Sequence, residues 1–412
     1  MESSDDRSGA VAATDPPITF PRDARPGPFD PPEVLRALRE KAPLVPMRFA
    51  DGHVGWFVTG YTAVRSILSD PRFSARPERH HLVVELPMAN AFAGRLTLSV
   101  SGMFHLQDPP EHTRYRRALA AEFTVQRMRR LEPTIAEITR ACLDDMARTG
   151  PPADLVEEFA FPVPSLVTCE LLGIDRDDRE GFRWAVATLS RWESGVEETR
   201  NALDTVLGFF PPLIRQRRER PGDDLISRLI AANTMTDEEL ATVGYILFAG
   251  GFETTANMLA LGTFALLEHP VQREALRRDP GLVGNAVEEL LRYLTIGHVG
   301  PQRAATEDVE IEGVLIRKGQ AVMMSLPAAN RDPGHFDDPE TLDLTRSAGG
   351  HVAFGHGVHG CLGQQLARVV MRIAYPALLD RFPRLRLAVP PERVPTKQNA
   401  MAYGVHRLPV EW

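Results

Sequence analysis

Residues 354 to 363 read FGHGVHGCLG, a stretch with four glycines, two histidines and one of the three cysteines of a 412-residue chain. The apolar, periodic segment LGQQLARVVMRIAYPALLDRF follows Cys361 directly and predicts a helix, which Pro376 should kink or break. Cys361 should therefore lie at a helix N-terminus, where unpaired backbone N–H groups and the positive dipole end favour thiolate over thiol. The glycines keep side chains away, so a large flat ligand can approach the backbone.

The polar residues of this stretch also allow other interpretations. His356, His359 and Cys361 offer three zinc ligands within six residues, but structural zinc takes four, and no second cysteine or Cys-x-x-Cys lies nearby. A phosphate-binding loop would have Lys-Ser or Lys-Thr after its glycines, and this stretch has neither. A buried structural thiol in a tight turn is the plainest alternative, and it stays open.

Composition and charge restrict the class of protein. A formal net charge of -8 and a pI of about 5.9 argue against a nucleic-acid partner. Three scattered cysteines indicate a reducing compartment. The start MESSDDRSGAVAATDPP does not resemble a signal peptide, and no apolar run is long enough for a membrane anchor. We expect a cytoplasmic monomer with a flexible segment over residues 1–24 and one domain over 25–412.

The pattern along the chain predicts a mainly α fold with a small β region, of the α+β class. HVGWFVTG, residues 53–60, is typical of a strand, and residues 307–326 alternate around glycines as short hairpins do. From about Glu111 onward the apolar periodicity is mostly helical.

One predicted helix is unusually long. Thr236 and Glu239 form a capping box, and apolar character continues to Leu267, before Pro270. This helix of about 30 residues would be roughly 45 Å long, and because it is apolar on nearly every face it should be buried. At its middle, residues 250–255 read GGFETT, which is unusual for a buried helix.

These features together carry a family resemblance. FGHGVHGCLG matches every fixed position of Phe-Gly-x-Gly-x-His-x-Cys-x-Gly, the haem-binding signature of the cytochrome P-450 superfamily. The resemblance runs from about Pro28 to Trp412. It implies the fold of that superfamily, with haem b held between the long helix and the cysteine loop with its following helix. It also implies that Cys361 is the axial thiolate ligand of the iron, with dioxygen as co-substrate.

The resemblance gives GGFETT a role as well. It is similar to the family's Gly-Gly-x-Glu-Thr, in which Gly250 and Gly251 let the helix lie close to the haem. It implies that Thr254 hydrogen-bonds the oxygen being activated and that Glu253 relays protons from water. Taken alone, a threonine inside a helix more often bonds back to its own turn, and a glutamate more often lies on a surface.

Further motifs imply the haem-holding residues. His112 and Arg116 lie on one helix face and match the family's His-x-x-x-Arg, while Arg303 and His351 match the other contacts to the haem propionates. As isolated residues each would more often be a surface charge. The full set of cofactor-binding residues implied by the resemblance is His112, Arg116, Arg303, His351, Phe354, Gly355, His359, Gly363, Gly250 and Gly251.

A second set has a structural role by resemblance. Glu289 and Arg292 match the family's Glu-x-x-Arg, and Arg346 matches the arginine that joins them. We expect these three residues to form a buried ion-pair network that is needed for the fold and not for the chemistry.

Electrons must come from another protein, because no G-x-G-x-x-G follows a strand in this chain. The resemblance implies NAD(P)H as the source, with a ferredoxin reductase and a ferredoxin of the 2Fe–2S or 3Fe–4S type as carriers. Six arginines fall in one short region, and we expect an acidic ferredoxin to dock near Arg114 and Arg117. A solvated helix face is the alternative. The six are Arg114, Arg116, Arg117, Arg127, Arg129 and Arg130.

The regions that contact substrate in the family are largely apolar here, which favours a hydrophobic substrate of moderate to large size. The resemblance favours regio- and stereoselective hydroxylation or epoxidation of a macrolide or other polyketide in antibiotic biosynthesis. A steroid, vitamin D or terpenoid hydroxylase is the alternative. The pocket residues implied are Leu86, Met88, Phe92, Phe248, Ala249, Ile296, Val299 and Met401.

Other classes share the same fold. A haem-thiolate gas sensor would need no proton relay, so Glu253 and Thr254 disfavour it. A peroxygenase or a nitric-oxide reductase would obtain its oxidant or hydride by a different route.

Overall fold

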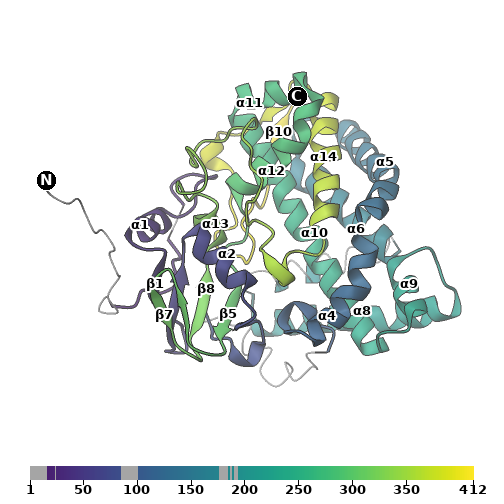
Figure 1. The fold of residues 1–412 in the computed structure, drawn as a ribbon. Coiled ribbons are helices and arrows are strands. Elements are labelled where there is room, and N and C mark those ends of the chain that lie inside the picture. The colour runs from purple at the N-terminus through teal and green to yellow at the C-terminus, as the bar shows by residue number, and fades with distance from the viewer. Residues whose placement is uncertain (1–15, 24, 85–100, 176–183, 186–187, 190–193) are drawn as a thin grey trace, which may run out of the picture.

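The computed structural model describes residues 16–23, 25–84, 101–175, 184–185, 188–189 and 194–412. The strands β1, β5, β7 and β8 lie on one side of the molecule, whereas β10 lies among the helices, with α10 in the interior and α14 in front of it (Figure 1). The α+β class and the helix-rich architecture predicted from the sequence are confirmed.

The helices include most of the described residues. They are α1 (Glu33–Lys41), α2 (Tyr61–Ser69), α4 (Glu111–Ala120), α5 (Val125–Thr149), α6 (Pro162–Leu172), α8 (Val196–Glu219), α9 (Leu225–Ala232), α10 (Asp237–Glu268), α11 (Pro270–Arg278), α12 (Val283–Leu294), α13 (Leu326–Ala329) and α14 (Gln364–Arg381). Single helical turns η2 (Phe104–Leu106) and η7 (Gly357–His359) border the site.

The strands form two sheets and a hairpin. The larger sheet has the order β1-β2-β8-β5-β3, with β2 parallel to β8, and the smaller has the order β4-β10-β9. The bounds are β1 (Leu44–Arg48), β2 (Val54–Val58), β3 (Phe73–Ser74), β4 (Ala153–Asp154), β5 (Gln302–Ala305), β6 (Val309–Ile311), β7 (Val314–Ile316), β8 (Ala321–Met324), β9 (Arg386–Leu387) and β10 (Pro409–Glu411). The predicted strand is confirmed, and of the hairpins predicted over 307–326 one forms, between β6 and β7, while β8 pairs with β2 and β5. The β6–β7 turn has positive φ at both Glu312 and Gly313.

Helix α10 begins and ends close to the predicted positions. The Thr236 hydroxyl accepts from the Glu239 N–H at 3.2 Å, and the Glu239 carboxylate accepts from the Thr236 N–H at 2.8 Å, so the capping box is present. Nearly every residue from 255 to 266 is buried, as the uniform apolar character predicts. None of the helices in the described part of the chain combines the length and apolar character needed to cross a membrane.

Helix α14 crosses α10 at close range. Tyr375 donates its hydroxyl to the Met258 carbonyl at 2.6 Å, and a Cβ on Gly262 would lie 2.0 Å from that hydroxyl oxygen. Only glycine therefore fits at position 262 without displacing Tyr375. The helix continues past Pro376 to Arg381, so the predicted break does not occur. Buried residues on both sides of Pro376, including Tyr375 and Leu378, hold the helix by packing.

A buried ion-pair network joins α12 to the loop before the cysteine. Arg292 and Glu289 are both fully buried, and the guanidinium donates from Nε and Nη2 to the carboxylate at 2.7 and 2.8 Å. Arg346 also donates to Glu289, at 3.2 Å. Arg292 donates to the carbonyl oxygens of Asn330 and Pro339 as well, and its guanidinium lies 5.3 Å from the centroid of the Phe336 ring. This network fixes the loop that leads to Cys361.

We predict that Arg292→Ala strongly destabilises the protein. The change would leave the Glu289 carboxylate buried without its partner, at a cost of about 3–5 kcal/mol in the free energy of unfolding. The measurement is chemical denaturation of both proteins. Arg277→Ala is the control, because Arg277 forms a partly exposed pair with Glu274 on α11, worth less than about 0.5 kcal/mol. Equal effects of the two substitutions would contradict the role of the network.

Candidate functional site

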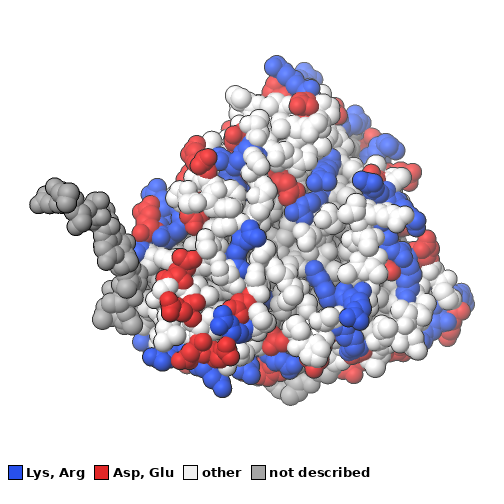
Figure 2. Space-filling view, viewed as in Figure 1, with Lys and Arg blue, Asp and Glu red and all other residues white. Residues whose placement is uncertain are grey.

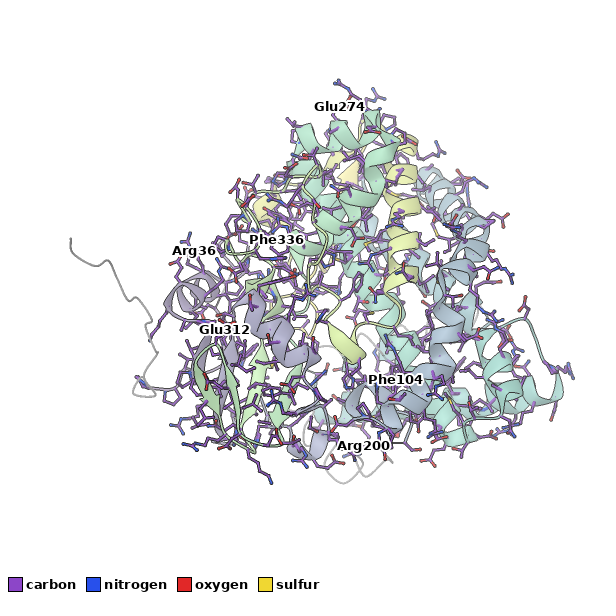
Figure 3. All side chains as sticks on the ribbon, in the orientation of Figure 1. Arg36, Phe104, Arg200, Glu274, Glu312 and Phe336 are labelled. Carbon is purple, nitrogen blue, oxygen red and sulfur yellow. The ribbon has the colours of Figure 1, made fainter. Side chains whose placement is uncertain are left out.

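A cavity lies between α10 and the cysteine loop. The loop and the start of α14 form one wall, and the middle of α10 forms the opposite wall. Residues of η2, α4 and α6 close the sides, and Phe104 of η2 is seen beside α4 (Figure 3). The lining residues include Phe104, His105, Arg116, Thr168, Ile246, Gly250, Gly251, Thr254, Phe354, His359, Gly360, Cys361 and Gly363.

Cys361 lies where the loop meets α14. Its backbone N–H donates to the Phe354 carbonyl at 2.8 Å, which closes the loop on itself. Burial raises the pKa of the Cys361 thiol, whereas the N–H groups of Gly363 and Gln364 and the guanidinium groups of Arg116 and Arg368 lower it. The start of α14 thus lowers the pKa of the thiol, as predicted, but burial raises it by more. A thiolate at this position needs a cation of its own, such as a metal ion.

The glycines of the loop have different reasons to be there. Gly357 has φ +70°, and a Cβ on it would lie 2.3 Å from the Leu68 carbonyl, so this glycine seats the loop on α2. Gly355 also has a positive φ, of +69°. An added Cβ on Gly363, or on Gly250 across the cavity, would meet no atom within 4 Å. These last two positions leave room on facing walls for a flat group.

The α10 wall carries two threonines and a glutamate. Thr254 donates its hydroxyl to the Gly250 carbonyl at 2.7 Å, and Thr255 donates to the Gly251 carbonyl at 3.0 Å. Thr254 is exposed toward the cavity, whereas Glu253 is only 9% exposed. The back-bond that sequence reasoning named as the alternative for Thr254 is therefore present, and it leaves the hydroxyl oxygen able to accept a hydrogen bond.

Buried nitrogen atoms close to the cysteine loop lack anionic partners. Arg303 is 7% exposed, burial lowers its pKa to about 10, and no carboxylate of the described residues forms an ion pair with it. The rings of His112 and His359 lie 4.2 Å apart between centroids and are tilted by 44°, and the buried Nδ1 of each has no hydrogen-bond partner in the described part of the chain. A group that carries carboxylates would satisfy these atoms. The residues present fit a haem with its propionates.

The other two predicted propionate contacts are already engaged. Arg116 donates to the Gly360 carbonyl at 2.7 Å and lines the cavity. His351 lies 3.2 Å from Glu288 through Nε2, and its Nδ1 accepts from the Ala353 N–H, also at 3.2 Å. Both ring nitrogens of His351 therefore have protein partners, and Arg368 holds Glu288 from the other side at 2.7 Å.

The histidines of the loop do not form a metal cluster with the cysteine. Nε2 of His356 lies 3.4 Å from Nη2 of Arg65, and the ring of His359 packs against the tilted ring of His112. Among the residues described, no group of three or more His, Cys, Asp or Glu side chains could hold a metal ion. Zinc held by protein ligands alone, the disfavoured interpretation of the sequence, has no support in the described residues.

A second cavity of about 740 Å³ lies next to the first. We call it the chamber; it is lined by Met103, His105, Leu106, Leu203, Leu207, Pro211, Asp237, Glu238, Ala241, Thr242, Tyr245, Ile246, Ala249 and Gly250. His105, Ile246 and Gly250 line both cavities, so the two spaces share a wall. The chamber is mostly apolar and of the size that binds a drug-sized molecule.

Of the two substrate contacts predicted on α10, one lines this chamber and the other does not. Ala249 lines it, but Phe248 is fully buried and packs on Phe252 at 5.0 Å between ring centroids. Ala241, Tyr245 and Ala249 of α10 line the chamber, whereas Phe248 is held in the core by its contact with Phe252. Tyr245 and His105 were missed by sequence reasoning; the period of α10 could have found Tyr245, but nothing in the sequence marked His105.

The remaining predicted contacts lie elsewhere. Ile296 packs on the main core, Val299 packs on the cluster beside the larger sheet, and Met401 is 43% exposed. Leu86, Met88 and Phe92 lie outside the described residues.

The predicted docking arginines are not equivalent. Arg114 contacts Glu239 and donates to the Thr234 carbonyl at 2.9 Å, so it braces the start of α10. Arg117, Arg129 and Arg130 are exposed and form no ion pair with another described residue. Lys and Arg side chains gather on the face that carries α4 and α5, the same face on which the cysteine loop is seen (Figure 2).

Comparisons with known proteins agree with this geometry. Residues 281–412 match the family model described as Cytochrome P450. The chain is 48% identical over 397 residues to Cytochrome P450 105C1 of a Streptomyces species, with 96% of this chain and 99% of the relative covered. It is 42% identical to pentalenic acid synthase of Streptomyces avermitilis, with 96% and 98% covered.

A solved structure is similar to this chain over most of its length. It is the mycinamicin VIII C21 methyl hydroxylase of Micromonospora griseorubida, bound to mycinamicin VIII, with a TM-score of 0.88, 34% identity, and 96% of this chain and 100% of that chain covered. Family membership implies haem and dioxygen, which suits the cysteine, the glycine walls, the buried Arg303 guanidinium and the unpartnered histidine nitrogens near the cavity. The chain belongs to the cytochrome P450 family and is a monooxygenase of that family.

Proposed function

We propose that this enzyme inserts one oxygen atom into a large, mostly apolar natural product of the macrolide or polyketide type. The observation that carries the proposal is the apolar chamber of about 740 Å³ that shares a wall with the cavity of Cys361. A molecule that fills the chamber can extend one end past Gly250 toward the sulfur. The mycinamicin VIII bound in the solved relative supports this substrate class.

Cys361 would hold the haem iron, and Arg303, His112 and His359 would hold the propionate edge. When bound, the haem would supply the redox chemistry that activates dioxygen, with Cys361 as the residue that holds its iron. Gly363 and Gly250 leave room for the ring on the two walls of the cavity. Arg116 keeps its bond to Gly360 and supports the loop from the side of α4. His351 could join the propionate contacts only by exchanging a present partner.

Thr254 and Glu253 would handle protons. The Thr254 hydroxyl donates to Gly250, so its oxygen can accept a hydrogen bond from a water or a protonated group in the cavity. Glu253 lies beside it on α10 and is 9% exposed, which suits a carboxylate that passes protons from outside into a site closed to bulk solvent. Oxygen cleavage then depends on this pair for its protons.

Electrons would reach the site from a ferredoxin reduced by NAD(P)H and a reductase. The exposed arginines of α4 and α5 carry this proposal, because an acidic partner would find unpaired cations on the face of the cysteine loop. Arg114 is not part of this surface, since it is already paired with Glu239.

Turnover tests the function. With ferredoxin, reductase, NADH and isotopically labelled dioxygen, we expect one labelled oxygen atom in the product from at least one macrolide in a panel that also contains steroids and vitamin D3. In Thr254→Ala the product formed per NADH should fall by about tenfold, because proton delivery is impaired. Thr255→Ala is the matched control, since Thr255 has the same back-bond but is 5% exposed.

Several results would contradict the proposal. Labelled product only from steroids or vitamin D3 would refute the substrate class. Turnover with peroxide but not with the electron carriers would indicate a peroxygenase, and binding of gases with no turnover of the panel would indicate a sensor.

The docking surface has a separate test. The double variant Arg129→Glu, Arg130→Glu should raise the ferredoxin concentration for half-maximal reduction roughly five- to tenfold at low salt, and the difference should shrink at high salt. The measurement is stopped-flow reduction of the haem. Lys318→Glu on the β7–β8 connection reverses one charge away from this face, against two in the double variant, and is the control. Identical salt-dependent kinetics for the double variant and the wild type would refute docking there.

A further inference from the structure

His105 occupies a position that the proposed chemistry does not use. It lies in η2 (Phe104–Leu106), seven residues before His112, and it lines both the cysteine cavity and the chamber. A molecule that extends from the chamber toward Cys361 therefore has to pass this side chain. We therefore expect a bound substrate to contact His105.

The imidazole has no partner within the described protein. Its one recorded ring contact is an edge contact with Phe104, at 6.0 Å between centroids, and neither ring nitrogen forms a hydrogen bond with a described residue. Burial and the nearby charge of Arg303 lower the pKa of His105 to about 4. A neutral imidazole has one ring nitrogen that donates a hydrogen bond and one that accepts.

A second polar side chain that lines the chamber also lacks a hydrogen-bond partner among the described residues. Tyr245 of α10 lines the chamber, and its hydroxyl forms no hydrogen bond with a described residue. Burial raises the pKa of Tyr245, with a smaller contribution from Glu253, so its hydroxyl keeps its proton. Thr242 differs, because its hydroxyl already donates to the Glu238 carbonyl at 3.0 Å. The mostly apolar chamber thus presents two neutral hydrogen-bonding groups without partners.

We propose that His105, assisted by Tyr245, is a specificity-determining residue that hydrogen-bonds an uncharged oxygen group, a hydroxyl or a carbonyl, on the substrate. The inference rests on the proposed function and adds to it the polar group that the substrate carries. A substrate with such an oxygen satisfies His105, whereas a pure hydrocarbon leaves it buried and unpaired. His105 then selects for oxygenated molecules and fixes which end points at Cys361.

A matched pair of small rigid probes tests the proposal. Biphenyl and 4-phenylphenol differ by one hydroxyl, and their dissociation constants can be measured by spectral titration of the haem-loaded protein. We expect the wild type to bind 4-phenylphenol roughly five- to tenfold more tightly than biphenyl, the worth of one hydrogen bond. In His105→Phe the ratio of the two constants should fall to near one, and in His105→Gln it should stay above about three, because the amide still donates and accepts.

Two further variants complete the design. Tyr245→Phe should lower the ratio by a smaller factor than His105→Phe, and Thr242→Val should leave it unchanged because the Thr242 hydroxyl is already satisfied. A wild-type ratio near one, or a ratio in His105→Phe equal to that of the wild type, would overturn the proposal.

The reduced carbon-monoxide spectrum of each protein separates this inference from the proposed function. A thiolate-type spectrum with an unchanged ratio overturns only the role of His105. Loss of that spectrum in the wild type overturns the proposed function and the inference together.

Discussion

The structure depends on keeping one buried sulfur at the point where a tight loop meets a helix. Burial by itself opposes a thiolate at Cys361, and the N–H groups of α14 and two arginines offset this only in part. A cation bound directly to the sulfur would favour the thiolate. The haem iron that membership of the cytochrome P450 family implies would supply such a cation.

The parts of the fold that surround the sulfur are positioned by different forces. The buried Glu289–Arg292–Arg346 network holds the segment before the loop, and the Leu68 carbonyl requires glycine at position 357. Across the cavity, α10 is held by its capping box, by Arg114 and by close contact with Tyr375 of α14. Polar interactions thus fix the edges of the site, and apolar packing fixes the distance between its walls.

Sequence reasoning succeeded where local chemistry decides the outcome. The capping box gave the start of α10, and the spacing of glycines around Cys361 gave the loop. It did not foresee the contacts that these residues make with other elements: Phe248 is buried in the core, Arg114 pairs with Glu239, and His351 pairs with Glu288. The roles predicted for the three residues stay predictions. Helix α14 continues past Pro376 because its buried residues pack on both sides, whereas the local effect of proline predicts a kink or break there. His105 could not be found at all, because only the shared wall of two cavities distinguishes it from other loop histidines.

The central claim, that Cys361 binds the haem iron as a thiolate, is tested most directly by the carbon-monoxide difference spectrum of the reduced protein. We expect the strongly red-shifted Soret band of a thiolate ligand in the wild type, and its loss in Cys361→Ser with Cys142→Ser and Cys169→Ser unchanged. A band typical of histidine ligation in the wild type, or a thiolate-type band that survives Cys361→Ser, would contradict the account.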